Sequence, residues 1–241
     1  MELIIPNWPA AKNIKAVSST RNGGISTGKY ESLNLGMHVG DDESRVRANR
    51  AKLADTADMP CQPVWLNQTH SSRVIEVVEP TQAILDGDGL FTKQQSIVCS
   101  VMTADCLPVL LTNVKGTQVS AVHAGWRGLS AGIIENAVRK FDGEVIAWIG
   151  PAIGSTSFEV GKDVFDSFVT IDSSATRAFN KINHNKWLAD MNMLVTQKLN
   201  LSGVTNVSYS RCCTFSEPQR FFSYRRDGVT GRLATFIWIE S

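Results

Sequence analysis

The sequence predicts a single α+β domain with a mixed sheet over residues 1–241. Short apolar runs typical of strands outnumber clear helical patterns, and two pairs of these runs are spaced as hairpins. Helical patterns occur among the strands without the regular strand–helix alternation of an α/β protein. No stretch rich in proline, glycine and serine indicates a linker, which favours one domain.

The strand predictions follow from apolar runs that end at turn residues. The first hairpin joins its two runs through residues 113–116, and the second turns at residues 227–231. The predicted strands are 15–20, 107–112, 117–123, 144–149, 221–225 and 233–239.

The helix predictions follow from apolar residues at a spacing of three or four and from acidic residues at the start of a segment. Asp41, Asp42 and Glu43 suit the positive end of a helix dipole, and they open a helix that continues to Ala57. Further helices are predicted over residues 130–141, 161–168 and 190–199.

Composition excludes several classes of partner. The net charge of +1 gives no general attraction to nucleic acid or to an anionic membrane. The N-terminus lacks the pattern of a secretion signal, and no apolar stretch approaches the ~20 residues of a membrane span. Five cysteines, two of them adjacent, are a poor basis for a disulfide framework. We therefore expect a cytoplasmic protein that binds neither nucleic acid nor a membrane.

Three residues at the ends of apolar runs form a candidate metal site. His123 precedes a Gly-x-x-Gly turn, Cys106 follows the run 97–102, and His70 follows the run 63–66. Zinc accepts cysteine sulfur and histidine nitrogen, and a catalytic zinc has three protein ligands and a fourth position for water. His70, Cys106 and His123 are such a set.

The same residues also support a catalytic mechanism that uses no metal. Cys106 would be a thiolate nucleophile and His123 its general base, and the sequence does not separate this chemistry from the metal. Asp105 is a candidate acid/base group or a residue that orients a histidine. Asp88, in a sequence of alternating aspartate and glycine, is interpreted as a turn residue.

Three arginines are candidates for substrate binding. Arg127 follows Gly125 at a predicted helix start, where backbone N–H groups and a cation suit an anion. Arg21 lies at a strand end beside two glycines, which permit close backbone approach. Arg225 lies beside a tyrosine and a second arginine, a combination that suits a phosphate or carboxylate with a flat ring.

Two enzyme classes are excluded by what the sequence lacks. A multicopper oxidase needs histidines for a type-1 copper and for a trinuclear cluster, and four histidines cannot supply both. The zinc nucleobase deaminases carry H-x-E and P-C-x-x-C, and neither occurs here.

Over nearly its full length the chain resembles the bacterial YfiH family, whose members were once called multicopper polyphenol oxidases or laccase-domain proteins. The family's motifs occur in one order, which makes the resemblance specific. The matching segments are residues 20–24, 32–36, 68–70, 104–106, 123–128, 149–154, 158–160 and 222–227.

The resemblance implies a four-layer α/β/β/α fold with mixed sheets, shared with a class of cysteine hydrolases. It implies zinc on His70, Cys106 and His123, with copper as an alternative metal in vitro. It also implies purine nucleoside chemistry: phosphorolysis of adenosine, inosine, guanosine and methylthioadenosine, and deamination of adenosine. The partners would then be a nucleoside and phosphate.

Two alternatives stay open. The resemblance also implies a cysteine or zinc hydrolase that edits peptidoglycan precursors by removing misincorporated L-Ser, so that the partner would be a cell-wall precursor. A binding module with structural zinc is less favoured, because three ligands leave an open position.

Overall fold

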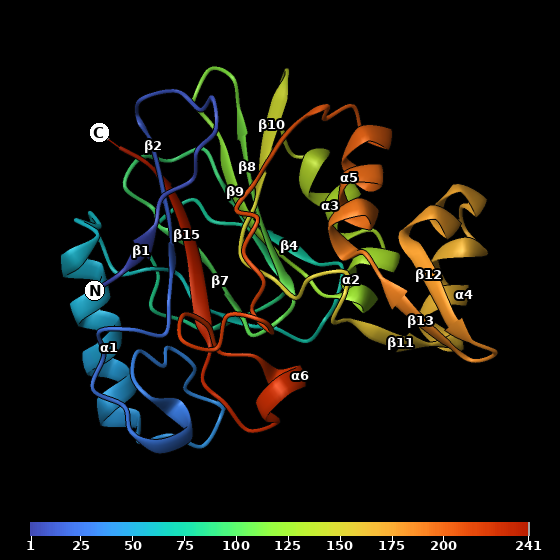
Figure 1. Ribbon diagram of the computed structural model, residues 1–241. Helices are drawn as coiled ribbons and strands as arrows, with labels where there is room; N and C mark the ends of the chain where they lie inside the picture. The colour runs from blue at the N-terminus through green and yellow to red at the C-terminus, as the bar shows by residue number, and fades with distance from the viewer. Residues whose placement is uncertain (241) are drawn as a thin grey trace.

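Two β-sheets pack face to face in the computed structural model, which describes residues 1–240 (Figure 1). The four-stranded sheet is antiparallel throughout, in the order β1 (Leu3–Ile4), β2 (Ile14–Ser19), β15 (Leu233–Ile239), β7 (Cys99–Thr103). The six-stranded sheet is mixed, because its two edge strands run parallel to their neighbours. Its order is β14 (Asn206–Tyr209), β10 (Val145–Ile149), β8 (Leu107–Asn113), β9 (Val119–Ala124), β6 (Gly89–Thr92), β4 (Val74–Glu76).

Helices cover the outer face of each sheet. Helix α1 (Glu43–Thr56) lies on the four-stranded sheet, and α3 (Ile133–Val138) and α5 (Met191–Leu201) lie on the six-stranded sheet (Figure 1). The predicted α+β class, with four α/β/β/α layers and mixed sheets, is confirmed. Not one of the helices within residues 1–240 has the length and apolar character needed to cross a bilayer.

Strand β8 shows why the sheets pack in this way. All seven of its residues are buried, because the strand is covered on both faces. Leu110 packs between the two sheets, whereas Leu111 packs under the helices, as the two-residue period of a strand requires. Each buried leucine contributes roughly 1.5–3 kcal/mol to the free energy of unfolding, so the central strands stabilise the sandwich from both sides.

Smaller elements complete the fold around this sandwich. Helix α4 (Lys162–Val169) packs on a three-stranded sheet at one flank, and two short helices, α2 (Trp126–Ser130) and α6 (Tyr224–Asp227), lie near the ends of the central strands (Figure 1). The others are β3 (Leu66–Asn67), β5 (Leu85–Asp86), β11 (Glu159–Gly161), β12 (Phe179–Asn183), β13 (Lys186–Ala189), η1 (Gly28–Tyr30) and η2 (Ser173–Ala178).

Most of the predicted elements are present. The hairpin of β8 and β9 is confirmed, as are the strands β2 and β10 and the helices α1, α4 and α5. The single helix over residues 130–141 is wrong. The chain instead forms α2 and α3, because Gly132 has a left-handed φ of 90° that interrupts the helix.

The C-terminal hairpin is also wrong. Strand β15 forms, but it pairs with β2 and β7. Its predicted partner, residues 221–225, instead includes the start of α6. The Ser223 hydroxyl caps this helix by accepting a hydrogen bond from the backbone N–H of Arg226 at 3.2 Å. The Arg226 guanidinium donates to the carbonyl oxygens of Thr214, Phe215 and Phe221, which fixes this segment as a helix and loop.

Candidate active site and metal centre

Strand pairing brings Cys106 and Asp88 to His123. His123 is the penultimate residue of β9, and its two neighbouring strands in the sheet are β8 and β6. On one side Leu107 pairs with Ala124, so Cys106 lies just beyond the end of β9. On the other side Gly89 pairs with Val122, so Asp88 lies beside His123, whose backbone N–H donates to the Asp88 carbonyl at 2.7 Å.

His70 reaches the same place through a separate pair of strands. Strands β3 and β5 run parallel, with Asn67 opposite Asp86, so the chain continues from both toward the same edge. His70 follows three residues after Asn67, in a left-handed conformation with φ of 61°. Its backbone N–H donates to Asp88 Oδ1 at 3.0 Å, which holds the histidine at the end of β9.

The structure brings His70, Cys106 and His123 together. One ligand atom from each lies within 4.8 Å of the other two, and Cys106 Sγ is 3.9 Å from His70 Nε2. The centroids of the two imidazole rings are 4.9 Å apart. Within residues 1–240 this is the only group of three or more His, Cys, Asp or Glu side chains that could hold a metal ion.

The geometry fits a tetrahedral zinc ion. Zinc–sulfur and zinc–nitrogen bonds of ordinary length place neighbouring ligand atoms about 3.3–3.6 Å apart, close to the separation of Cys106 and His70. His123 donates from Nδ1 to Asp88 Oδ1 at 2.8 Å, which leaves its Nε2 as the ligating atom. A carboxylate behind a ligating histidine is the usual support of a zinc site. Two imidazoles and one thiolate could therefore hold a metal ion, and three ligands would leave one position open.

Asp88 is the buried anchor of this centre, and its interpretation as a turn residue is wrong. Its carboxylate is fully buried. It accepts hydrogen bonds from the backbone N–H groups of Thr69, His70 and Ser71, from the Ser71 hydroxyl and from His123 Nδ1. One signal in the sequence could have identified it: Asp88 directly precedes the apolar segment 89–91, where a buried charge needs partners.

These hydrogen bonds also set the ionisation of Asp88. Burial acts to raise the pKa of the carboxyl, but the hydrogen bonds from His123 and Ser71 outweigh it and lower the pKa to about 2. Asp88 is therefore a carboxylate at neutral pH, and it fixes the Nδ1 proton of His123 on the side away from Cys106.

Cys106 and His123 stabilise opposite charges on each other. Burial raises the pKa of the Cys106 thiol, but the adjacent His123 imidazolium, with hydrogen bonds from both histidines, lowers it to about 6. Burial lowers the pKa of His123, but the Cys106 thiolate and the hydrogen bond to Asp88 raise it to about 9. Without a metal, the two groups form a thiolate–imidazolium pair at neutral pH.

Gly125 leaves no spare space around the three ligands. A Cβ atom at this position would lie 2.7 Å from His70 Cδ2 and 3.2 Å from Cys106 Sγ. The close approach of the backbone therefore requires glycine here, although its φ of −67° is open to any residue.

Asp105 is next to Cys106, but both of its carboxylate oxygens have partners. Oδ1 accepts from the Thr214 hydroxyl at 2.6 Å, and Oδ2 accepts from the backbone N–H of Arg225 at 2.7 Å. The residue is buried and has a left-handed φ of 97°. The carboxylate thus ties the turn between β7 and β8 to helix α6.

Two cavities open onto the ligand cluster. One has a volume of about 450 Å³ and reaches from Cys106 and the two histidines to His38 and Arg232. The other, of about 210 Å³, extends from the same cysteine toward the side chains of Trp126, Phe158 and Met191. The residues shared by both cavities are His70, Ala104, Cys106, Arg127 and Tyr224.

The three predicted substrate-binding arginines occupy different places. Arg127 lines both cavities, and Arg225 lines the smaller one. The Arg225 guanidinium lies over the Phe158 ring and donates to the Glu159 carbonyl at 2.6 Å. Arg21 is in the lining of neither cavity: it donates to the carbonyl oxygens of Glu31 and Pro218 and stacks on Phe222.

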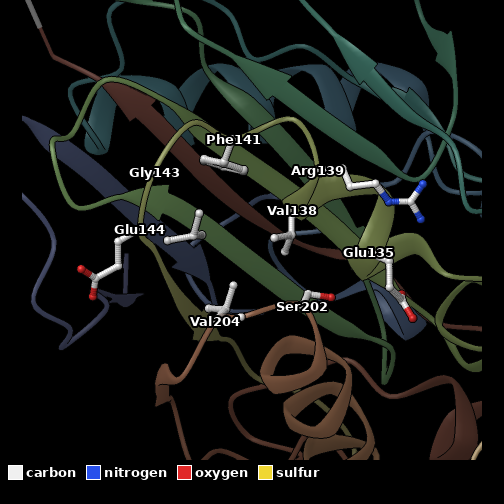
Figure 2. A pocket seen from close by; sticks show the side chains of 10 residues that line it. Glu135, Val138, Arg139, Phe141, Gly143, Glu144, Ser202 and Val204 are labelled. Carbon is white, nitrogen blue, oxygen red and sulfur yellow. The ribbon is translucent and has the colours of Figure 1, made fainter.

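A further cavity lies away from this centre, between α3, the start of β10 and the loop after α5 (Figure 2). Its volume is about 470 Å³, and its charged side chains are Glu135, Arg139 and Glu144. Glu135 is paired with Lys198 at 2.8 Å. None of the predicted site residues lines this cavity, so it lies outside the candidate site.

Comparison with known proteins identifies the family. The model of a family described as "Multi-copper polyphenol oxidoreductase laccase" matches residues 15–240. The chain belongs to this laccase-domain family. A Haemophilus influenzae relative named purine nucleoside phosphorylase is 47% identical, with all of both chains covered. An Escherichia coli K12 relative named purine nucleoside phosphorylase YfiH is 46% identical over 99% of each chain.

A solved structure agrees with the fold of this laccase-domain protein. The crystal structure of a Neisseria meningitidis protein superposes with a TM-score of 0.96 at 43% identity, with all of both chains covered. The predicted resemblance to the YfiH family is confirmed.

Proposed function

We propose that the chain is a cytoplasmic, zinc-dependent purine nucleoside phosphorylase. The observation that carries the proposal is the opening of two chemically different cavities onto one His-Cys-His cluster. The names of the relatives support the nucleoside, and the five free cysteines support a reducing compartment. His70, Cys106 and His123 would hold the zinc, which when bound supplies positive charge and Lewis acidity.

Phosphorolysis joins a phosphate oxygen to the ribose C1′ and breaks the bond between C1′ and purine N9. The electron pair of that bond leaves with the purine, which takes up a proton, so the products are ribose 1-phosphate and the free base. The reaction needs an anion site, a wall for a flat ring and a fixed position for the ribose between them. The larger cavity, lined by Arg127 and Arg232, would supply the anion site. The smaller cavity, lined by Trp126 and Phe158, would supply the wall for the ring, and the His-Cys-His cluster that both cavities share would lie beside the ribose.

The proposal covers adenosine, inosine, guanosine and methylthioadenosine, which share the purine ring and ribose. It also covers deamination of adenosine, in which the oxygen of water forms a bond to C6 and ammonia leaves. The reacting carbon then lies on the base instead of the ribose, so the nucleoside must bind in a second position. Asp105, with its carboxylate held by Thr214 and Arg225, would serve as a positioning residue for α6 in either case.

Product analysis tests the proposal. Zinc-loaded protein is incubated with inosine with and without phosphate, and hypoxanthine and ribose 1-phosphate are quantified by chromatography. We expect release of hypoxanthine that requires phosphate and is lost in Cys106→Ser. Cys61→Ser is the matched control, because Cys61 lines neither cavity and, within residues 1–240, its thiol donates to backbone carbonyls. Hypoxanthine release that does not depend on phosphate would contradict phosphorolysis.

A second candidate function rests on the line of side chains from Cys106 through His123 to Asp88. His123 contacts the sulfur on one side and Asp88 on the other, as in a cysteine hydrolase. The thiolate would attack an amide carbonyl of a cell-wall precursor carrying L-Ser. His123 would protonate the leaving amine, and water would then release the acyl group from sulfur.

The metal-stripped protein separates the two candidates. The hydrolase should release L-Ser from a UDP-MurNAc-L-Ser precursor without zinc and form an acyl-enzyme that mass spectrometry locates on Cys106. The phosphorylase should be inactive without zinc toward either substrate. Activity of the metal-stripped protein that is abolished in Cys106→Ala would overturn the zinc proposal.

A further inference from the structure

We infer that Arg232, His38 and Arg127 form an anion subsite in the larger cavity, and that this subsite takes the phosphate. The smaller cavity then takes the purine ring. The identity of the anion rests on the proposed function, whereas the existence of an anion subsite rests on the charges that line the cavity.

Outside the cluster of His70, Cys106 and His123, the side chains that line the larger cavity carry no negative charge. Two arginines and His38 line it together with the metal cluster, and none of its lining residues is an aspartate or glutamate. Within residues 1–240, no carboxylate lies at ion-pair distance from Arg232 or Arg127. Burial and the positive charges of Arg232 and Arg50 lower the pKa of His38, so its imidazole is neutral at pH 7 and would contribute a hydrogen bond to the subsite, not a charge.

Arg232 is the best placed of the three to bind an anion. Its side chain is half-buried, and burial lowers the pKa of its guanidinium, so the charge is only partly compensated by water. The only hydrogen bonds of its guanidinium in the described residues join Nη1 to the carbonyl oxygens of Thr230 and Gly231, both at 3.1 Å. The remaining donors of the planar guanidinium suit two phosphate oxygens.

The backbone around Arg232 is built to hold it. Asn34 Oδ1 accepts from the backbone N–H of Arg232 at 2.9 Å and from that of Gly36 at 2.9 Å. A Cβ atom on Gly36 would lie 2.7 Å from Arg232 Cγ, so the arginine stem passes directly over this glycine. The motif at residues 32–36 therefore positions Arg232, and His38 follows two residues after Gly36.

The smaller cavity differs in its walls. It too is lined by two arginines, Arg127 and Arg225, but the Arg225 guanidinium already donates to the Glu159 carbonyl and lies over the Phe158 ring. Trp126, Phe158 and Met191 present aromatic and apolar surface, which suits a flat heterocycle better than an anion. Both cavities reach Cys106 and His70, so a ribose at the cluster would connect a base in one with a phosphate in the other. The phosphate oxygen would form its bond to C1′ there as the bond to N9 breaks.

Kinetics of Arg232→Gln test the subsite in the zinc-loaded protein. The loss of a charged donor pair should raise the KM for phosphate roughly 10–100-fold, with less than about a threefold change in the KM for inosine. Arg232→Lys, which keeps the charge but not the planar pair of donors, should recover part of the loss. Arg47→Gln is the matched control, since Arg47 is exposed on α1 and lines neither cavity.

Calorimetric titration of inorganic phosphate into zinc-loaded protein, without nucleoside, separates this inference from the proposed function. We expect binding to the wild type and to Arg47→Gln, and a loss of roughly tenfold or more in Arg232→Gln. If phosphate binds in this way but no nucleoside is cleaved, the subsite stands and the phosphorylase proposal fails. If phosphate does not bind the wild type, or binds Arg232→Gln equally well, the inference is overturned.

Discussion

At the scale of single residues, Asp88 determines the geometry of the candidate site. One buried carboxylate holds the backbone on both sides of His70 and the ring of His123, although His70 follows β3 of the two-stranded sheet and His123 lies on β9 of the six-stranded sheet. The positions of the two candidate histidine ligands therefore depend on a residue outside the candidate ligand set. Cys106 completes the set from the turn before β8.

Asp88→Asn should weaken zinc binding about 10–100-fold, because an amide removes the negative charge behind the ligating His123. Competition with a chromophoric chelator measures the affinity. Asp86→Asn is the matched control: Asp86 is exposed, two residues away, and bonded only to Asn67 in the described chain. Equal zinc affinities for the two variants would contradict the role of Asp88.

Gly125→Ala should abolish stoichiometric zinc binding or lower the affinity at least tenfold, because the new methyl group would contact His70 and Cys106. Metal analysis after dialysis measures the bound zinc. In the control Gly161→Ala, the methyl group meets only the mobile carboxylate of Asp163, far along the chain from the cluster. Full zinc occupancy in Gly125→Ala would show that the site has more room than the structure indicates.

At the scale of elements, the sequence predicts what local signals determine. The β8–β9 hairpin and the helices α1, α4 and α5 carry their own turn residues, caps and apolar spacing, and all are present. The segment 221–225 was mispredicted because distant groups decide its structure: Asp105 holds the backbone of Arg225, and Arg226 binds three carbonyl oxygens. Strand periodicity carries no information about such contacts.

The candidate site likewise contains residues that local sequence signals predict and residues that they do not. His70, Cys106 and His123 could be chosen because each follows an apolar run in a chain with few histidines. Asp88 offers only its place before the apolar segment 89–91, since the pairing of β6 with β9 decides what it contacts. His38 and Arg232 could not be chosen, because the position of Arg232 depends on its contact with Gly36. Local sequence does not determine which strands pair with each other. It also does not determine a contact between residues that lie about two hundred positions apart.

Helix α5 illustrates a local signal that can be tested by itself. Asp190 caps it by accepting from the backbone N–H of Met193 at 2.9 Å. Asp190→Ala should lower the free energy of unfolding by about 1 kcal/mol, as measured by urea denaturation. Asn200→Ala, at an exposed position near the other end of the helix, should change it little. A loss in Asn200→Ala as large as that in Asp190→Ala would contradict the capping role.

At the scale of the whole molecule, the metal cluster joins segments that are far apart in sequence. Its three ligands come from the loop after β3, the turn before β8 and the end of β9. The sandwich of two sheets supplies the rigid frame, and residues of α2 and α6 line the cavities. An ion bound here stabilises only the folded chain.

Zinc should therefore raise the melting temperature. At a free concentration about a hundred times its Kd the ion adds about 2.7 kcal/mol, which for a chain of this length corresponds to roughly 5–10 °C. Differential scanning calorimetry with zinc and with a chelator measures the shift. It should be retained in Cys61→Ser and lost in Cys106→Ser, and a shift that survives in Cys106→Ser would place the stabilising ion elsewhere.

The most direct test of the account is a titration of zinc into metal-free protein, followed by phosphate-dependent cleavage of inosine at each point. The account predicts that activity rises in proportion to bound zinc and reaches its plateau at one ion per chain, and that His70→Ala and Cys106→Ser stay inactive throughout. Full phosphorolysis by the metal-free protein would contradict a zinc-dependent phosphorylase, and so would protein that is saturated with zinc but inactive.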